Sequence, residues 1–409
     1  MKPLIATIKD AWIIVSITLL CLLTVELFAT AAVFVRVRLG DGDIDARMHA
    51  DAYESAAWAP AYFKELHSMP GFRWHPYLHW RRVPFEGEYT NIDARGLRKT
   101  WNPPLLQGAK RLRIFIFGGS TTWGTGARDD HTIPSFVAKL LAGDYGINVE
   151  VTNFGTSAYI STQEVIALAR ELQAGNFPDL VVFYDGANDT FGTIQNGGVA
   201  GLPNNAPNRV REFNLLLPRN SHRLYRESLL MALNNSATYQ VSRSLVRRAT
   251  GHELPANLIW GEQVYEQPAV EKVATESARI YAWNVNFARS LRGTYGFESL
   301  FYWQPVIFTK DTRTAYEEEV RKTVKDLERY YEATIVRVKE TLANVDSFHD
   351  ISEVFKRDER PHFIDPWHIA ESGNETVARR MLKDVGPIVH KLRTRQHEDR
   401  HSILGFHAH

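Results

Sequence analysis

Two short segments, far apart in the sequence, carry the side chains needed for nucleophilic catalysis by a serine. The first reads FGGSTT at 117–122, and its glycines allow the sharp turn that exposes the hydroxyl of Ser120. The second reads DPWH and places Asp365 three residues before His368, so that the carboxylate can orient the imidazole. A histidine held in this way can take the proton of a serine hydroxyl. The pair predicts Ser120 as the nucleophile, His368 as the general base and Asp365 as the third member of a triad.

Two further segments, which lie between the first two, supply neutral hydrogen-bond donors. They read NFGTS at 153–157 and DGAND at 185–189. The backbone amide of Gly155 and the side-chain amide of Asn188, beside a serine, are donors that stabilise an oxyanion when they converge on one point. Each has a simpler explanation in isolation, because Gly155 could serve only to permit a tight turn and Asn188 only to cap a helix.

Spacing and composition disfavour other kinds of site. The serine does not lie in a G-x-S-x-G motif, and His131, His362 and His368 do not form the H-E-x-x-H pattern of a zinc site. The single cysteine, Cys21, excludes a disulfide framework and a cysteine zinc site. The 48 Lys and Arg residues balance 47 Asp and Glu residues without a long basic run, which makes nucleic acid a poor partner. We therefore expect no cofactor, no metal and no nucleic acid.

The elements that would position these segments are short apolar runs that alternate with helical stretches. Such alternation predicts βαβ units and a parallel sheet, and ligands bind at the edge where the carboxyl ends of parallel strands meet. The runs expected to form strands are 112–117, 149–153, 180–184, 299–303 and 347–351. The stretches expected to form helices are 133–142, 162–174, 270–292 and 316–342.

The order of these elements predicts how the chain is divided. We expect, in turn, an anchor, an extended connector, a catalytic domain and a C-terminal tail at 1–40, 41–110, 111–395 and 396–409. More than 100 residues separate the third and fourth strands, so most of 191–267 must be an insertion. Its apolar and basic stretch 224–248 is expected to be helical, as a lid, as a membrane-surface element or as a pair that only packs on the domain.

The anchor is predicted from a run, Ala11 to Val35, that is apolar except for Ser16, Thr18, Thr24, Glu26 and Thr30. About 20 such residues span a bilayer as a helix. A buried core helix and a signal peptide cleaved after 29–31 are alternatives, although the apolar residues that continue to position 35 favour an uncleaved anchor. Lys and Arg residues on the two sides nearly balance, so charge does not set the orientation.

In this order, the four segments resemble the four blocks of the SGNH (GDSL-like) hydrolase superfamily. The resemblance covers about 112–391 without the insertion. It implies the α/β class and a flavodoxin-like three-layer αβα fold with a parallel sheet, here preceded by a transmembrane helix. It also implies a triad of Ser120, His368 and Asp365, with an oxyanion hole formed by the Ser120 amide, Gly155 and Asn188.

Two other positions bear on this resemblance. Many members carry aspartate before the nucleophile, where this chain has Gly119. We expect the change to be tolerated because that aspartate is outside the triad. The segment 91–98, NIDARGLR, is similar to one that precedes the domain in membrane-tethered members.

The resemblance implies a membrane-anchored serine esterase that acts on an O-acyl or O-acetyl group of a carbohydrate or cell-envelope polymer. Membrane-tethered members generally process envelope or secreted carbohydrates, so we expect the catalytic domain to lie outside the cytoplasm. One alternative is an O-acyltransferase that uses the same triad, and another is a catalytically idle binding or assembly module of a membrane complex. The expected partners are thus the ester substrate and the membrane.

Overall fold

The chain folds into two compact units, and the structure, a computed structural model, describes residues 2–39, 45–104, 111–215, 221–252, 254 and 267–405. The sheet unit consists of 44–206 and 266–409, and the anchor unit of 1–43 and 207–265. All four segments with candidate catalytic residues lie in the sheet unit. Residues 191–206, which we expected within the insertion, also belong to the sheet unit.

The sheet unit is built around five parallel strands in the order β6-β5-β7-β8-β9. These are β5 (Leu112–Gly118), β6 (Val149–Asn153), β7 (Leu180–Asp185), β8 (Glu298–Trp303) and β9 (Phe348–Asp350). Each strand end lies within one residue of the predicted run, and the order is that of flavodoxin-like folds. The predicted fold class is therefore confirmed. Phe117, Phe183 and Phe301 stack across three neighbouring strands, with ring centroids 5.2 and 5.1 Å apart.

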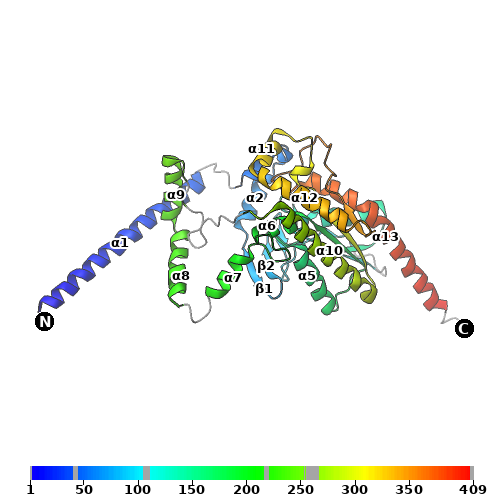
Figure 1. The fold of residues 1–409 in the computed structure, drawn as a ribbon, viewed down its shortest axis with the longest axis horizontal. Coiled ribbons are helices and arrows are strands. Elements are labelled where there is room, and N and C mark those ends of the chain that lie inside the picture. The colour runs from blue at the N-terminus through cyan, green and yellow to red at the C-terminus, as the bar shows by residue number, and fades with distance from the viewer. Residues whose placement is uncertain are drawn as a thin grey trace. The chain divides into compact units, whose positions relative to one another are not determined.

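Helices form layers on the sheet, as Figure 1 shows. Helix α10 packs against α5, α6 and α12, and α4 packs against α13. Their bounds are α3 (Ser120–Trp123), α4 (Ile133–Asp144), α5 (Ser161–Gln173), α6 (Ala187–Gln195), α10 (Val270–Tyr295), α11 (Ala315–Thr323), α12 (Lys325–Thr341) and α13 (Glu371–Gly405). The single helix predicted over 316–342 is two helices, interrupted at Val324. Helix α13 runs past the expected domain end at 395 into the residues expected to form a tail.

The connector has more regular structure than its sequence pattern suggested. It contains α2 (Ala59–Ser68) and two antiparallel pairs, β1 (Phe72–His75) with β2 (His79–Arg82), and β3 (Phe85–Glu86) with β4 (Asn91–Ile92). Its buried aromatic side chains Tyr53, Tyr62 and Phe63 form a small core with Ile364 and Ala370. This core joins the connector to the chain on both sides of the Asp365–His368 turn.

The anchor unit contains only helices among its described residues. They are α1 (Lys2–Leu39), α7 (Ala206–Leu215), which starts at the unit boundary, α8 (Ser221–Asn235) and α9 (Ala237–Thr250). Within α1, Lys9–Val35 is long and apolar enough to cross a membrane, with a mean hydropathy of 2.3. Helix α9 contacts both α1 and α8.

Candidate active site

The candidate residues lie where three parallel strands end. Strand β5 leads through Gly119 into α3, which begins at Ser120. Strand β7 leads through Gly186 into α6, whose second residue is Asn188. Gly186 has φ of 139°, a conformation that a side chain would strain. The fold thus brings the two segments to one edge of the sheet, as the sequence predicted.

Ser120, His368 and Asp365 form a continuous hydrogen-bonded chain. The Ser120 Oγ lies 2.6 Å from His368 Nε2, and His368 Nδ1 lies 2.6 Å from Asp365 Oδ2. The other carboxylate oxygen of Asp365 accepts hydrogen bonds from the backbone amides of Trp367 (3.0 Å) and His368 (2.8 Å). These contacts fix the imidazole between the hydroxyl and the carboxylate, which is the geometry that proton transfer from the serine requires.

Asp365 is held in its charged form. Burial favours the neutral carboxyl, but the neighbouring His368, the two backbone amides and Arg47 outweigh it and hold the pKa of Asp365 below its usual range. Arg47 Nη1 lies 3.3 Å from Asp365 Oδ2, and the same guanidinium is fixed by Asp45 at 2.6 Å. The acid of the candidate triad therefore has a cationic partner from the connector.

A buried ion pair supports the loop that leads to Asp365. Lys310 Nζ lies 2.6 Å from Glu317 Oε2, and both side chains are fully buried. The other oxygen of Glu317 accepts hydrogen bonds from the backbone amides of His362 (2.9 Å) and Phe363 (3.0 Å). Burial opposes ionisation of Glu317, but Lys310 and these amides lower the pKa of its carboxyl.

The side-chain amide of Asn188 lies directly beside the candidate nucleophile. A Cβ atom at Gly119 would lie 2.2 Å from Asn188 Nδ2, so the absence of a side chain there lets the amide approach. This contact gives a physical reason for glycine at position 119. The amide of Ser120 lies at the start of α3, next to the same point.

Gly155 is placed differently from Asn188. Its backbone amide donates a hydrogen bond of 2.9 Å to Asn153 Oδ1. A Cβ atom at Gly155 would lie 2.3 Å from the backbone nitrogen of Trp123, so glycine permits close packing against α3. The Gly155 amide thus donates within its own loop, and the residue packs against the backbone of the turn that carries Ser120.

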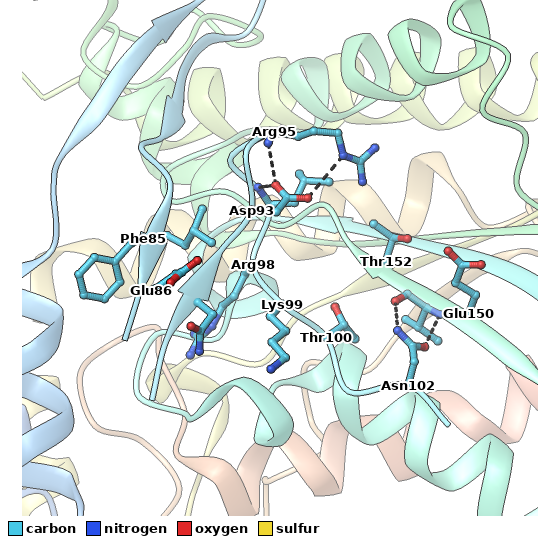
Figure 2. Close-up of a pocket in the computed structure, with 14 residues that line it drawn as sticks. Phe85, Glu86, Asp93, Arg95, Arg98, Lys99, Thr100, Asn102, Glu150 and Thr152 are labelled. Carbon is cyan, nitrogen blue, oxygen red and sulfur yellow. Dashed lines mark hydrogen bonds and ion pairs between the residues drawn. The ribbon is translucent and has the colours of Figure 1, made fainter. Parts of the chain in front are cut away.

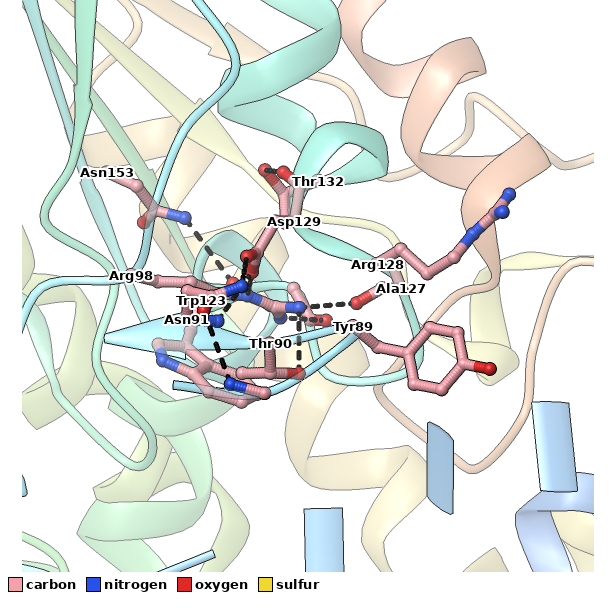
Figure 3. Close-up of polar contacts among 12 residues, drawn as sticks. Tyr89, Thr90, Asn91, Arg98, Trp123, Ala127, Arg128, Asp129, Thr132 and Asn153 are labelled. Atoms are coloured by element: carbon pink, nitrogen blue, oxygen red, sulfur yellow. Dashed lines mark hydrogen bonds and ion pairs between the residues drawn. The ribbon is translucent and has the colours of Figure 1, made fainter. Parts of the chain in front are cut away.

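Arg98 and Asn153 hold the carboxyl end of α3 (Figure 3). Arg98 donates from Nη1 to the carbonyl oxygens of Trp123 (3.1 Å) and Gly124 (2.7 Å) and from Nη2 to that of Ala127 (2.6 Å). Asn153 Nδ2 donates to Thr122 O at 3.0 Å. Arg98 also pairs with Asp129 at 2.9 Å. The segment 91–98 thus contributes to the support of the Ser120 turn.

Three buried carboxyl groups flank Asn188 in the fold. Glu164, Asp185 and Asp189 are all buried, and Asp189 accepts hydrogen bonds from the amide (3.2 Å) and hydroxyl (2.5 Å) of Ser161. Burial raises the pKa of Asp189 to about 6. Burial and mutual repulsion raise the pKa values of Glu164 and Asp185 well above their usual range. Burial thus favours the neutral, protonated form of these carboxyl groups.

Two aromatic side chains adjoin the candidate catalytic groups in sequence and pack on each other. Phe191 follows Asn188 by three residues, Trp367 precedes His368, and their ring centroids are 4.2 Å apart. Both rings are only partly buried. They form an apolar surface next to the hydrogen-bonded chain that starts at Ser120.

A cavity of about 400 Å³ lies elsewhere in the sheet unit (Figure 2). Its lining includes Asp93, Arg95, Lys99 and Glu150 and none of the candidate triad residues. Asn102 and Val151 also line it, and the Asn102 side chain pairs with the backbone of Val151 through hydrogen bonds of 2.9 and 2.7 Å. The connector here covers the edge strand β6, which would otherwise expose unpaired backbone groups.

Three residues that support the site, Arg47, Lys310 and Glu317, were not predicted from the sequence. No local motif marks any of them. Among the residues that the structure describes, no group of three or more His, Cys, Asp or Glu side chains is arranged to hold a metal ion. His362 lies 3.0 Å from Asp358 and His131 lies 2.6 Å from Asp130, each within its own segment.

Comparison with known proteins gives a family match. The family model described as GDSL-like Lipase/Acylhydrolase matches residues 114–381, and no curated protein matches the sequence. Among solved structures, the chain is similar to the acetyl xylan esterase AlAXEase, at 14% identity and a TM-score of 0.35, covering 67% of this chain and 100% of that one. It is similar to a carbohydrate acetylesterase from Sinorhizobium meliloti, at 12% identity and a TM-score of 0.36, covering 68% and 100%. A lipase from a goat rumen metagenome matches at 12% identity and a TM-score of 0.37, covering 66% and 95%.

Proposed function

We propose, because this chain belongs to the GDSL-like lipase/acylhydrolase family, that its ester-hydrolysing activity uses Ser120, His368 and Asp365 as a catalytic triad. The chain is an enzyme that hydrolyses ester bonds. The observation that carries the assignment of the triad is the pair of 2.6 Å contacts in series, from Ser120 Oγ to His368 Nε2 and from His368 Nδ1 to Asp365 Oδ2. Each of these contacts joins two of the three assigned residues directly.

The proposed reaction has two steps. Ser120 Oγ attacks the ester carbonyl carbon while His368 Nε2 takes its proton, and Asp365 stabilises the resulting imidazolium. His368 then gives this proton to the leaving alkoxide, which departs and leaves an acyl group on Ser120. A water molecule attacks the acyl-enzyme by the same route and releases the carboxylic acid and Ser120.

We assign the oxyanion hole to the Asn188 side-chain amide and the Ser120 backbone amide. Two donors aimed at the carbonyl oxygen of the substrate supply the main electrostatic stabilisation of the tetrahedral state. The approach of Asn188 Nδ2 to Gly119 supports this assignment. Gly155 takes part only if its amide turns away from Asn153 Oδ1, to which it donates at 2.9 Å.

The substrate class proposed is an O-acyl group, most simply acetyl, on a carbohydrate or envelope polymer. The partly buried aromatic surface of Phe191 and Trp367 supports this class, because apolar faces of sugar rings pack on aromatic rings. The test compares p-nitrophenyl acetate with p-nitrophenyl octanoate and measures acetate release from acetylated glycans. We expect a preference for acetate and release from the glycan. A strong preference for octanoate with no release from any glycan would contradict the proposed class.

We also propose that α1 anchors the enzyme in a membrane, with the N-terminus inside and the sheet unit outside the cytoplasm. The apolar helix Lys9–Val35 supports the anchor, and the orientation follows from the proposed envelope substrate. Alkaline phosphatase fused to the C-terminus of the full chain is expected to be active. Fluorescence from a reporter that folds only in the cytoplasm, fused at the same place, would show the opposite orientation.

A further inference from the structure

The turn between α8 and α9 is unusual in charge. Residues 228–242, SLLMALNNSATYQVS, contain no charged side chain, although 23% of the whole chain is charged. Arg226 and Glu227 precede this stretch, and Arg243 follows it. Residues 207–265 as a whole hold eight arginines and four glutamates, with no lysine or aspartate. The insertion therefore has an uncharged stretch at the junction of α8 and α9, which we call the tip, between arginine-rich flanks.

The uncharged tip exposes large apolar side chains. Leu229, Met231 and Leu233 on α8 are 62%, 48% and 47% exposed. Leu229 and Leu233 lie on one side of α8 and Met231 lies on the opposite side, because residues two apart do not share a helix face. Exposed apolar groups around a helix mark a segment that meets a partner or a membrane. We name Leu229, Met231 and Leu233 the tip patch.

The tip is tied to the candidate membrane helix through Glu26. This glutamate is the only charged residue between Ala11 and Val35. Its carboxylate accepts hydrogen bonds from the backbone amides of Ala237 (2.6 Å) and Thr238 (3.1 Å), the first two residues of α9. The first amides of a helix lack partners within the helix and carry its positive dipole end, so they match a carboxylate that lies in an apolar span.

The burial of α1 side chains places the contact on one face. Among the α1 side chains that the structure describes, residues 9–35, those of Glu26, Ala29 and Val33 are partly buried and the rest are exposed. Their spacing of three and then four residues places them on one side of a helix. Helix α9 therefore contacts α1 on this side, and the small side chain of Ala29 permits a close approach.

The position of Glu26 sets a depth for the tip. Glu26 precedes Val35, the end of the apolar span, by nine residues, which corresponds to about 14 Å of helix. The first turn of α9 must lie at the same level, because its amides bond to this carboxylate. An isolated charge at such a depth is costly in a bilayer unless it is paired, and the hydrogen bonds to α9 provide the pairing.

We infer that the turn between α8 and α9 is inserted in the bilayer beside α1, with the tip patch among the acyl chains. This inference rests on the proposed anchoring by α1. Arg243 and Arg248 lie farther along α9 from this turn, where we expect them to reach the lipid phosphates, so that anionic lipids strengthen the insertion. The insertion is thus a second membrane element, joined to α1 by the hydrogen bonds of Glu26.

The test uses the full chain with Cys21→Ser, carrying one new cysteine labelled with the fluorophore NBD. The variants are Leu229→Cys in the tip patch and, as a matched control, Ala249→Cys at the far, exposed end of α9. Each is reconstituted in phosphatidylcholine vesicles with and without phosphatidylglycerol. We expect blue-shifted emission at position 229 that lipids spin-labelled on the acyl chain quench at least twofold more than at position 249. The quenching should increase with phosphatidylglycerol.

A second substitution separates this inference from the proposed anchoring. Glu26→Leu removes the carboxylate and leaves the span apolar, so the chain should still resist extraction by carbonate while the label at position 229 loses its acyl-chain quenching. Glu26→Gln, which keeps one acceptor oxygen, should retain part of it. If the unsubstituted chain is extracted by carbonate, the anchoring by α1 fails and the insertion with it. If the chain is retained but the label at position 229 is in water, or is shielded only by cross-linking to a second copy, the insertion alone is wrong.

Discussion

The turn that carries Ser120 and the loop that carries His368 are held by different kinds of contact. Around Ser120, Arg98 donates to the carbonyl oxygens of Trp123, Gly124 and Ala127, groups that do not titrate, and only its further contact with Asp129 involves a carboxylate. The His368 loop instead depends on ionised carboxylates. Asp365 contacts His368 and Arg47, and Glu317 contacts Lys310. We therefore expect changes of pH to affect the position of the general base, His368, and to leave the position of the nucleophile, Ser120, unchanged.

The largest effect on activity is expected when the turn loses its nucleophile or the loop loses its base. Ser120→Ala and His368→Ala should each lower kcat by several orders of magnitude, as removal of one triad member usually does. Because the two side chains act as one unit, the double variant should be hardly slower than either single variant. Turnover of p-nitrophenyl acetate by folded protein is the measurement. A Ser120→Ala enzyme that keeps more than about a tenth of the activity would refute the nucleophile assignment.

A smaller loss is expected at the oxyanion position next to the nucleophile. Asn188→Ala should lower kcat about 100- to 1000-fold, the usual effect of removing one such donor. Gly119→Ala should displace the same amide, because a Cβ atom there would lie 2.2 Å from Asn188 Nδ2, and so reproduce much of the loss. Circular dichroism serves as the control for folding. If Asn188→Ala leaves kcat unchanged, the residue is only a helix cap.

The loop that carries Asp365 and His368 should show its dependence on charge when Arg47 is replaced. Arg47→Gln removes the cation beside Asp365, so the carboxylate attracts the imidazolium proton more strongly. The acid limb of the profile of kcat/KM against pH should therefore move to higher pH by about one unit. Arg47→Lys should restore part of the original profile, whereas a purely structural role would change the rate without moving the limb. Asp93→Asn, a charge change away from the triad, is the matched control.

The smallest effect concerns the buried carboxyl groups beside Asn188. Because burial raises their pKa values, their contribution to stability is complete below about pH 4 and is lost as the pH rises through the folded values, about 6 for Asp189. Glu164→Gln keeps the shape and removes one of these carboxyls. From pH 5 to pH 8, the fall in Tm should be smaller for the variant than for the wild type, and the two falls should differ by about 3 °C. Parallel Tm curves for the two proteins would contradict this account.

The strands and the candidate triad could be predicted because their signals are local. Buried parallel strands such as β5 and β7 are short apolar runs, and the polar residues that follow them reach one edge of the sheet whatever the helices do. Contacts such as Arg47 with Asp365 join residues 318 positions apart without any motif. The packing of Gly155 on Trp123 and the break in the helix at Val324 likewise depend on tertiary context that no local pattern carries.

The contact between Arg47 and Asp365 also has a consequence for the order of synthesis. The connector leaves the ribosome before its partners Ile364 and Asp365, which follow more than 300 residues later. Long-range pairing of this kind forms late in folding. A nascent chain therefore contains Ser120 long before it contains the base that deprotonates it, and the enzyme acquires activity only when the segment of Asp365 and His368 folds back on the connector.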